Sequence, residues 1–300
     1  MAYTTLIQVT ELKKLIESGS PLMVFDCSFD LMNPALGESQ FLESHIPGAI
    51  HADLDKNLSA KHGSPGAGGT VIVAGEADQP ASGGRHPLPN RERFSMWLSQ
   101  IGFSNDMQAV VYDRNGANYC GRLWWMLKWA GHEAVAVLDG GLQAWQGAGN
   151  PVASGEAAGH FQSNFELKAP LVRLVNAEDV LSRLGTGSQT VIDARAPARY
   201  RGEVEPLDPV AGHIPGALNR PFTSNIGADG KFKPANQLRE EFSDLLRGRS
   251  PDNVVHQCGS GVSALPNLIA MEVAGLGRSA LYAGSWSDWC SNPQRPVEKN

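Results

Sequence analysis

The segment SHIPGAI (Ser44–Ile50) returns as GHIPGAL (Gly212–Leu218) in the second half of the 300-residue chain. The sequences on either side of the two copies are also similar to each other. Upstream, VTELKKLIESG matches VNAEDVLSRLG, and each stretch is typical of an N-capped helix that ends at a glycine. Downstream, the stretch around Gly116 matches the stretch around Gly261. Because the repetition covers most of both halves, the sequence predicts a duplicated fold.

Short apolar runs alternate with longer helical stretches in each half. Runs such as LMVFD and TVIDA lack polar alternation, which is typical of strands buried on both faces of a parallel sheet. We therefore expect an α/β fold with two tandem domains, each a mainly parallel sheet flanked by helices. The predicted domains span residues 1–150 and 165–300. Asn150–Pro170 is rich in Gly, Ala, Ser and Pro and is interpreted as a linker, and the glycine-rich residues 61–90 as a surface excursion of the first domain.

Composition excludes several classes of function. The net charge is −6 and there is no long Lys/Arg run, so nucleic acid is not an expected partner. The four cysteines are scattered, which predicts neither a disulfide framework nor a zinc site, and no metal or other cofactor is expected. No signal-peptide pattern and no stretch of about 18 uncharged apolar residues occurs, so no membrane association is expected. A cytoplasmic location fits this composition best.

The two halves differ at one loop position, where Asp113 of the first half stands opposite Cys258 of the second. Both residues follow an apolar run and precede a predicted helix. Ligands of open α/β sheets bind at the carboxyl ends of strands, where these residues are expected to lie. The chemistry is therefore expected in the second half alone.

The sequence around Cys258 favours a thiolate. Gly259 and Gly261 allow positive φ angles, and a tight loop of this kind can turn successive N–H groups toward an anion. A helix from about Ser263, with Pro266 in its first turn, would point its positive end at the same place. The alternative is a cysteine that only packs in the core, as free cysteines often do. The glycines, the loop position and the one-sided replacement favour a nucleophile.

The motifs CGSGVS, HIPGA and YAGSWSDW resemble those of the rhodanese superfamily, in particular its two-domain sulfurtransferases, over nearly the whole chain. In that family an inactive N-terminal domain precedes a catalytic one, whose cysteine carries sulfane sulfur as a persulfide. The loop CGSGV followed by Ser resembles that of 3-mercaptopyruvate sulfurtransferases, whereas thiosulfate-preferring members carry a basic Cys-Arg-Lys-Gly loop. The resemblance implies transfer from 3-mercaptopyruvate to cyanide or a thiol, such as thioredoxin or a small thiol, with release of pyruvate.

The resemblance also implies roles for individual residues. The expected catalytic residues are Cys258, Ser260 and His45, and the expected substrate-binding residues are Arg199, Gly259, Gly261, Val262, Ser263 and Tyr112. Cys258 would be the nucleophile, Ser260 and His45 a proton relay, and Arg199 the ligand of the donor's carboxylate. A structural role would also explain His45, because HIPGA occurs in both halves, and Tyr112 could simply pack.

Two alternatives and one departure from the family remain. Family members often have a second arginine where this chain has Leu207 and Asp208, so the carboxylate is bound by Arg199 alone or by Arg199 and Arg201. A rhodanese-like phosphatase would need a Cys-x5-Arg loop, but Ala264 occupies the arginine position. A thiosulfate sulfurtransferase, or a binding module that only carries sulfur, is the other alternative.

Overall fold

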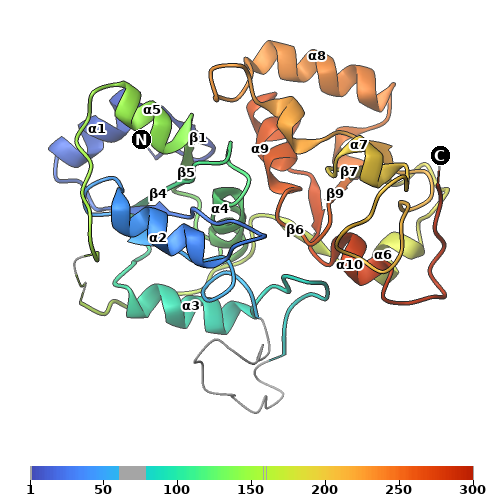
Figure 1. Ribbon diagram of the computed structural model, residues 1–300, viewed down its shortest axis with the longest axis horizontal. Helices are drawn as coiled ribbons and strands as arrows, with labels where there is room; N and C mark the ends of the chain where they lie inside the picture. The colour runs from blue at the N-terminus through green and yellow to red at the C-terminus, as the bar shows by residue number, and fades with distance from the viewer. Residues whose placement is uncertain (1, 61–78, 158, 160, 300) are drawn as a thin grey trace. The chain divides into compact units, whose positions relative to one another are not determined.

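The computed structural model describes residues 2–60, 79–157, 159 and 161–299 (Figure 1). The chain divides into two compact units. In the first unit the strands are β1 (Leu6–Ile7), β2 (Leu22–Asp26), β3 (Ile50–His51), β4 (Gln108–Tyr112) and β5 (Val135–Leu138). Its helices are α1 (Val9–Glu17), α2 (Ala35–Glu43), α3 (Arg91–Gln100), α4 (Cys120–Trp129) and α5 (Gly141–Gly147).

The second unit repeats this alternation. Its strands are β6 (Arg173–Val175), β7 (Thr190–Asp193), β8 (Leu218–Asn219), β9 (Val254–Gln257) and β10 (Ala280–Tyr282). Its α-helices are α6 (Ala177–Leu181), α7 (Pro197–Tyr200), α8 (Ala235–Leu246), α9 (Leu265–Val273) and α10 (Ser285–Trp289). Two short 3-10 helices, η2 (Phe222–Asn225) and η3 (Pro251–Asn253), complete the unit as described.

The two sheets have the same topology. Their strand orders are β1-β5-β4-β2-β3 and β6-β10-β9-β7-β8, and the pairs in both are parallel. In the register of these sheets, Asp26 lies opposite the last residue of β4, and Asp193 lies opposite the last residue of β9. The next residues, Asp113 and Cys258, therefore occupy equivalent positions. The predicted duplication and the parallel α/β class are confirmed.

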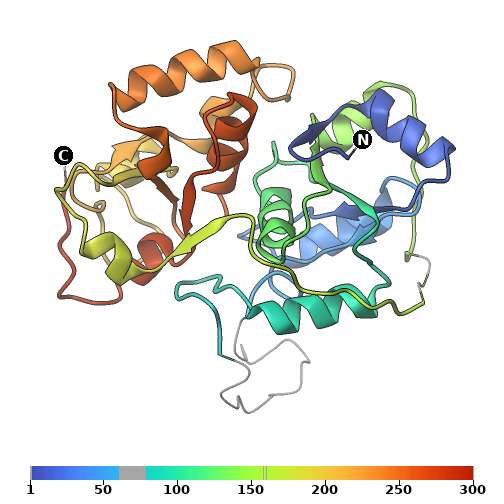
Figure 2. The same ribbon diagram turned by 180° about the vertical axis from the view of Figure 1, so that it is seen from behind.

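Helices cover both faces of each sheet, as the uninterrupted apolar strands require. In the first unit, Val110 of β4 belongs to the core that α1 and α5 cover, whereas Phe25 of β2 contacts Trp97 of α3 with ring centroids 6.3 Å apart. In the second unit, Trp286 and Trp289 of α10 pack in one core cluster with strand residues. Figures 1 and 2 show α8 and α9 on the other side of that sheet.

The division of the chain differs from the predicted domain limits. The first unit comprises Met1–Ala81 and His86–Leu171, and the second comprises Ser82–Arg85 and Val172–Asn300. The predicted linker is hydrogen-bonded to the first unit, where the Lys168 N–H donates to the Ala130 carbonyl at 3.0 Å.

The excursion of residues 61–90 was expected to belong to the first domain. That expectation is wrong for Ser82–Arg85, which group with the second unit. The physical reason is a set of contacts with α10, among them a hydrogen bond of 3.0 Å from the Arg85 N–H to Ser287 Oγ. Residues 61–78 of the excursion lie outside the described residues.

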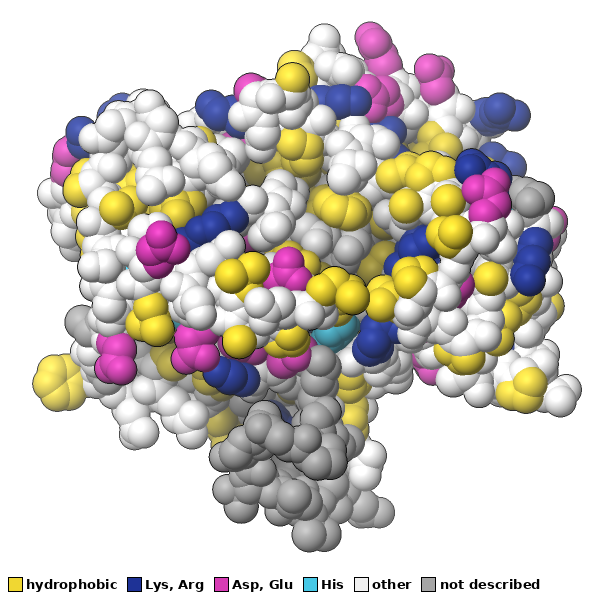
Figure 3. Space-filling view, viewed as in Figure 1, with side chains coloured by type: hydrophobic (Ala, Val, Ile, Leu, Met, Phe, Trp, Pro, Cys, Tyr) yellow, Lys and Arg dark blue, Asp and Glu magenta, His cyan; other side chains and the backbone are white. Residues whose placement is uncertain are grey.

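Charged side chains of both signs are interspersed over the face that Figure 3 shows. On that face the described residues form no extended basic patch of the kind that binds a phosphate backbone. None of the described helices is both long enough and apolar enough to cross a membrane.

The strand that leads to Cys258 contains a buried histidine whose protonation opposes folding. His256 is fully buried, and its Nε2 lies 3.1 Å from Met271 Sδ. Burial, and secondarily the charge of Arg220, lowers the pKa of His256 from its ordinary value of 6.5 to about 3. As the pH falls from about 6.5, the unfolded chain therefore takes up a proton that the folded protein does not accept.

We expect the free energy of unfolding to fall by about 2 kcal/mol between pH 6.5 and 5 because of this one group. Urea unfolding of the wild type and of His256→Leu at both pH values measures the effect. The substitution should make the pH dependence shallower, since leucine takes up no proton. Identical pH dependence in both proteins would contradict the neutral, buried state of His256.

Candidate active site

Cys258 is the first residue of the loop that joins β9 to α9, and only 2% of its surface is exposed. Hydrogen bonds tie its backbone to the start of α10. The Cys258 N–H donates to Ser285 Oγ at 3.1 Å, and the Cys258 carbonyl accepts the Trp286 N–H at 3.0 Å. The next carbonyl, that of Gly259, accepts the Ser287 N–H at 2.9 Å. The loop is therefore fixed against α10 before any ligand binds.

The two loop glycines serve different purposes. Gly261 has φ +76°, and a side-chain carbon placed there would lie 2.2 Å from the Ala283 carbonyl oxygen, so no larger residue fits. The expectation of a positive φ at Gly259 is wrong, because Gly259 is not among the residues with positive φ. Its small size matters instead. A carbon placed there would lie 3.3 Å from Arg85 Nη2 and 3.4 Å from Arg199 Nη1.

The equivalent loop of the first unit contains an anion. The Asp113 carboxylate accepts the backbone N–H groups of four loop and helix residues at 2.8–3.1 Å. These residues are Asn115, Ala117, Tyr119 and Cys120. By the register of the two sheets, the corresponding positions of the second unit are Ser260, Val262, Ala264 and Leu265. In the first copy of this fold, the amides of the loop thus bind a negative charge, as an anion nest does.

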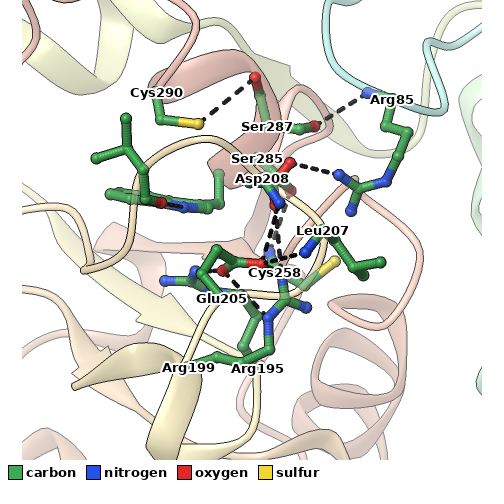
Figure 4. A network of polar contacts seen from close by, with 12 residues as sticks. Arg85, Arg195, Arg199, Glu205, Leu207, Asp208, Cys258, Ser285, Ser287 and Cys290 are labelled. Atoms are coloured by element: carbon green, nitrogen blue, oxygen red, sulfur yellow. Dashed lines mark hydrogen bonds and ion pairs between the residues drawn. The ribbon is translucent and has the colours of Figure 1, made fainter. Parts of the chain in front are cut away.

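Three arginines and three carboxylates lie around the Cys258 loop, and Figure 4 labels all of them except Asp193. Arg195 lies deepest, and its guanidinium pairs with Asp193 at 2.7 Å and with Glu205 at 3.3 Å. Burial lowers the pKa of Arg195, but the negative charges of Asp193 and Glu205, together with a smaller interaction with Cys258, outweigh burial and raise this pKa above its ordinary value. The Arg195 guanidinium is therefore within electrostatic reach of the Cys258 sulfur.

Arg199, on α7, is held by two carboxylates. Its Nη2 donates to Glu205 Oε1 at 2.6 Å and to Asp208 Oδ2 at 3.2 Å, while its Nη1 faces Gly259. Burial raises the pKa of Glu205, but hydrogen bonds from Arg199 and from the N–H groups of Leu207 and Asp208 lower it below its ordinary value overall. Glu205 is therefore an anion that anchors Arg199.

The third arginine, Arg85, comes from the segment Ser82–Arg85 of the second unit. Its Nη1 donates to Asp208 Oδ1, so the two oxygens of Asp208 bind two different arginines. With three guanidiniums and three carboxylates, the cluster is balanced in charge without Cys258. Among the described residues, no group of His, Cys, Asp and Glu side chains could hold a metal ion.

Ser260 and Val262 lie buried in the Cys258 loop, and Ser263 is half-buried beside them. Arg201, the alternative carboxylate ligand, lies at the end of α7. Its exposed side chain is held by the equally exposed Glu203, with Nε donating to Oε1 at 2.6 Å. The structure therefore brings Arg199, and not Arg201, to Gly259.

His45 and Tyr112 lie in the first unit. The His45 Nδ1 lies 2.8 Å from the Phe41 carbonyl, and the two rings stack with centroids 4.0 Å apart. His213 repeats this arrangement with Tyr200, at 2.7 Å and 3.9 Å. A shared structural role thus accounts for the repeated HIPGA. The Tyr112 hydroxyl accepts the Ile46 N–H at 3.0 Å, and burial, together with the charge of Asp26, raises its pKa.

Sequence reasoning missed six residues of the site: Arg85, Asp193, Arg195, Glu205, Asp208 and Ser285. Arg195 and Glu205 stand close to Arg199 in the sequence, and their opposite charges were the available signal. Ser285 lies in the YAGSWSDW motif. The sequence around Arg85 gave no sign of its role, because its partner Asp208 lies 123 residues away in the chain.

The chain is similar to several known proteins. The family model for the rhodanese-like domain matches twice, at residues 8–148 and 176–292, and the chain belongs to the rhodanese family. A probable 3-mercaptopyruvate sulfurtransferase of Pseudomonas aeruginosa is 44% identical over 280 residues, 92% of each chain. A putative thiosulfate sulfurtransferase of Mycobacterium tuberculosis is 36% identical over 97% of this chain and 96% of its own. The crystal structure of the Escherichia coli 3-mercaptopyruvate sulfurtransferase superposes with a TM-score of 0.75 and 30% identity, covering 95% of this chain and 100% of its own.

The different roles of the two glycines can be tested by stability. Gly261→Ala should lower the free energy of unfolding by about 2 kcal/mol or more, because the new methyl group meets a backbone carbonyl at a positive φ. Gly259→Ala, the matched control, should stay within about 0.5 kcal/mol of the wild type, since only the end of the Arg85 side chain must shift slightly. Urea unfolding measures both values, and equal losses in the two variants would contradict the separate roles of Gly259 and Gly261.

Proposed function

We propose that the protein moves sulfane sulfur from 3-mercaptopyruvate to a thiol acceptor through a persulfide on Cys258, and releases pyruvate. One observation carries this proposal. The thiol of Cys258 stands at the position where the first unit places a carboxylate held by four N–H groups. A loop of this kind suits both a thiolate and the persulfide anion that follows it. The relatives of the chain, at 31–44% identity, include several named as 3-mercaptopyruvate sulfurtransferases.

In the first half-reaction the Cys258 thiolate attacks the sulfur of the donor. A sulfur–sulfur bond forms while the carbon–sulfur bond of the donor breaks, and the electron pair stays on carbon as the enolate of pyruvate. The enolate takes up the proton that the donor thiol gives up. A persulfide anion and pyruvate result without net uptake of protons. Ser260, buried in the loop, is our proposed carrier of this proton.

Substrate binding is assigned to Arg199 and the loop. Its Nη1 faces Gly259, one residue from the nucleophile, while its other nitrogens are anchored on Glu205. A fixed guanidinium in this place can bind the donor's carboxylate and hold its sulfur near Cys258. By analogy with the four N–H groups that hold Asp113, the amides of Ser260, Val262, Ala264 and Leu265 face the anionic sulfur in this proposal, and Gly259, Gly261 and Ser263 complete the loop.

The second half-reaction returns the enzyme to its starting state. An acceptor thiolate attacks the outer sulfur of the persulfide, which breaks the sulfur–sulfur bond and restores the Cys258 thiolate. A small thiol or the thiol of thioredoxin would serve, and cyanide would leave as thiocyanate. No metal or organic cofactor enters this cycle, because the carried group is sulfur itself.

Thiosulfate is the second candidate donor, since one relative is named as a putative thiosulfate sulfurtransferase. The charges of the site favour 3-mercaptopyruvate. The residues Cys258–Ser263 carry no charge, and the three arginines are balanced by three carboxylates. A compact dianion must lose its hydration without a net positive charge to compensate it, whereas a monocarboxylate requires only its one charge to be matched.

Cys258→Ser should release no pyruvate from 3-mercaptopyruvate above the uncatalysed background, while it keeps the wild-type fold. The matched control is Cys290→Ser, because Cys290 is also buried in the second unit but lies in the core cluster outside the loop. This variant should keep most of the activity. A steady-state pyruvate assay measures both, and substantial turnover by Cys258→Ser would refute the assignment of the nucleophile.

The donor preference is tested with cyanide as the common acceptor. We expect kcat/KM for 3-mercaptopyruvate to exceed that for thiosulfate by at least about tenfold, which corresponds to about 1.4 kcal/mol of transition-state binding. Equal values for the two donors would mean that the charge argument fails and that the protein is a thiosulfate sulfurtransferase.

A further inference from the structure

We infer that Arg85 is a second carboxylate-binding residue of the site, paired with Arg199 by the bridging carboxylate of Asp208. This role rests on the proposed function and extends it. Arg85 belongs to the segment Ser82–Arg85, which groups with the second unit. In the chain, this segment is separated from the rest of that unit by residues His86–Leu171 of the first unit.

Asp208 sets the spacing of the two arginines. One of its oxygens accepts Arg85 Nη1 and the other accepts Arg199 Nη2, and the Asp208 side chain is only 3% exposed. The nitrogens that remain on the side of Gly259 are Arg85 Nη2 and Arg199 Nη1. They lie 3.3 and 3.4 Å from the place where a side-chain carbon of Gly259 would stand. Two N–H groups from different arginines thus converge beside the residue that follows Cys258.

The backbone around Arg85 is fixed by close contact with α10. A carbon placed on Gly84, which has φ +89°, would lie 2.4 Å from the Gly284 carbonyl oxygen, and one placed on Gly83 would lie 2.6 Å from Asp288 Oδ1. Only glycines let the chain approach so closely. The Arg85 N–H then donates to Ser287 Oγ, on the helix that also holds the Cys258 loop (Figure 4). Arg85 and Cys258 are therefore positioned by the same element.

The arrangement suits a 2-oxo acid whose sulfur is at C3. A carboxylate has two oxygens, and two converging guanidiniums can bind one each with charge-assisted hydrogen bonds. Within the described residues, the Nε of Arg85 is buried without a hydrogen-bond partner, so this guanidinium is incompletely satisfied by the protein. A carboxylate bound beside Gly259 lies next to the residue that follows Cys258, and two carbons separate this carboxylate from the donor's sulfur.

The pairing of the two arginines also explains the aspartate in the segment GEVEPLDP. Asp208 stands near the place where a second substrate arginine was expected. It supplies no positive charge itself, but it binds a guanidinium from a distant part of the chain. The segment thus lacks an arginine of its own, but Asp208 holds the guanidinium of Arg85 beside it.

The test compares two alkylating reagents that react with Cys258. In 3-bromopyruvate and in bromoacetone, the thiolate displaces bromide and forms a thioether, but only 3-bromopyruvate carries a carboxylate. Mass spectrometry measures how fast each reagent adds to the protein, and the rate with 3-bromopyruvate is divided by the rate with bromoacetone. This ratio does not depend on sulfur transfer. We expect Arg85→Gln to lower this ratio by about ten- to a hundredfold. Arg85→Lys should lower it less, because an ammonium keeps the charge beside Asp208 but lacks the planar fork.

Arg183→Gln is the matched control, since it removes an exposed arginine of the same unit and should leave the ratio unchanged. Arg201→Gln tests the alternative ligand and should also leave it unchanged. An unchanged ratio in Arg85→Gln, or equal slowing of both reagents, would overturn the inference. So would a fall in Arg201→Gln as large as that in Arg85→Gln.

The two proposals fail in different ways. If the wild type releases no pyruvate from 3-mercaptopyruvate, the proposed function fails, and the reagent ratio still decides the role of Arg85 toward a carboxylate. If the wild type releases pyruvate and Arg85→Gln keeps the wild-type ratio, only the role of Arg85 fails. Arg85→Lys keeps the pairing with Asp208 possible, so it provides the readout if Arg85→Gln does not fold.

Discussion

The second unit depends on three buried carboxylates that are paired with three guanidiniums beside one thiol. Asp193, Glu205 and Asp208 are all nearly inaccessible to solvent, with side chains exposed by 3% or less. A buried charge is tolerated only when it is paired and hydrogen-bonded, and removal of one partner leaves the other uncompensated. This requirement accounts for the path of the chain after β7, which returns so that Glu205 accepts hydrogen bonds from both Arg195 and Arg199. It also accounts for the attachment of Ser82–Arg85 to the second unit through Asp208.

The duplication shows how such a site can arise from a structural loop. In the first unit, Asp113 fills the anion nest, and the next residue, Arg114, donates to Asp26 at 2.9 Å. In the second unit a thiol takes the place of Asp113, and Gly259 takes the place of Arg114. The aspartate equivalent to Asp26 is then paired by Arg195 from its own loop. The anion and the cation of the first loop therefore have no counterpart at the equivalent positions of the second loop.

The repeated motifs were sufficient to predict the fold, because each local pattern of apolar runs and caps agreed with a parallel α/β unit. The position of Cys258 also followed from the repeat alignment, which the strand register confirms. The arginine cluster could not be predicted in the same way. Arg85 meets Asp208 only because two glycines bring its backbone against α10, and no periodic pattern encodes a contact over 123 residues. The φ expected at Gly259 was wrong for a related reason, since a glycine can be required by its neighbours rather than by its own backbone.

The central claim is that Cys258 carries the sulfur, and a single turnover tests it most directly. The enzyme is mixed with one equivalent of 3-mercaptopyruvate in the absence of acceptor, then digested under conditions that preserve persulfides, and pyruvate is measured in the same sample. We predict that the peptide containing Cys258 gains the mass of one sulfur atom, that a reductant removes it, and that it forms in equal amount with pyruvate. Sulfur on a peptide containing Cys27, Cys120 or Cys290 instead, or pyruvate released without a sulfur adduct, would contradict the account.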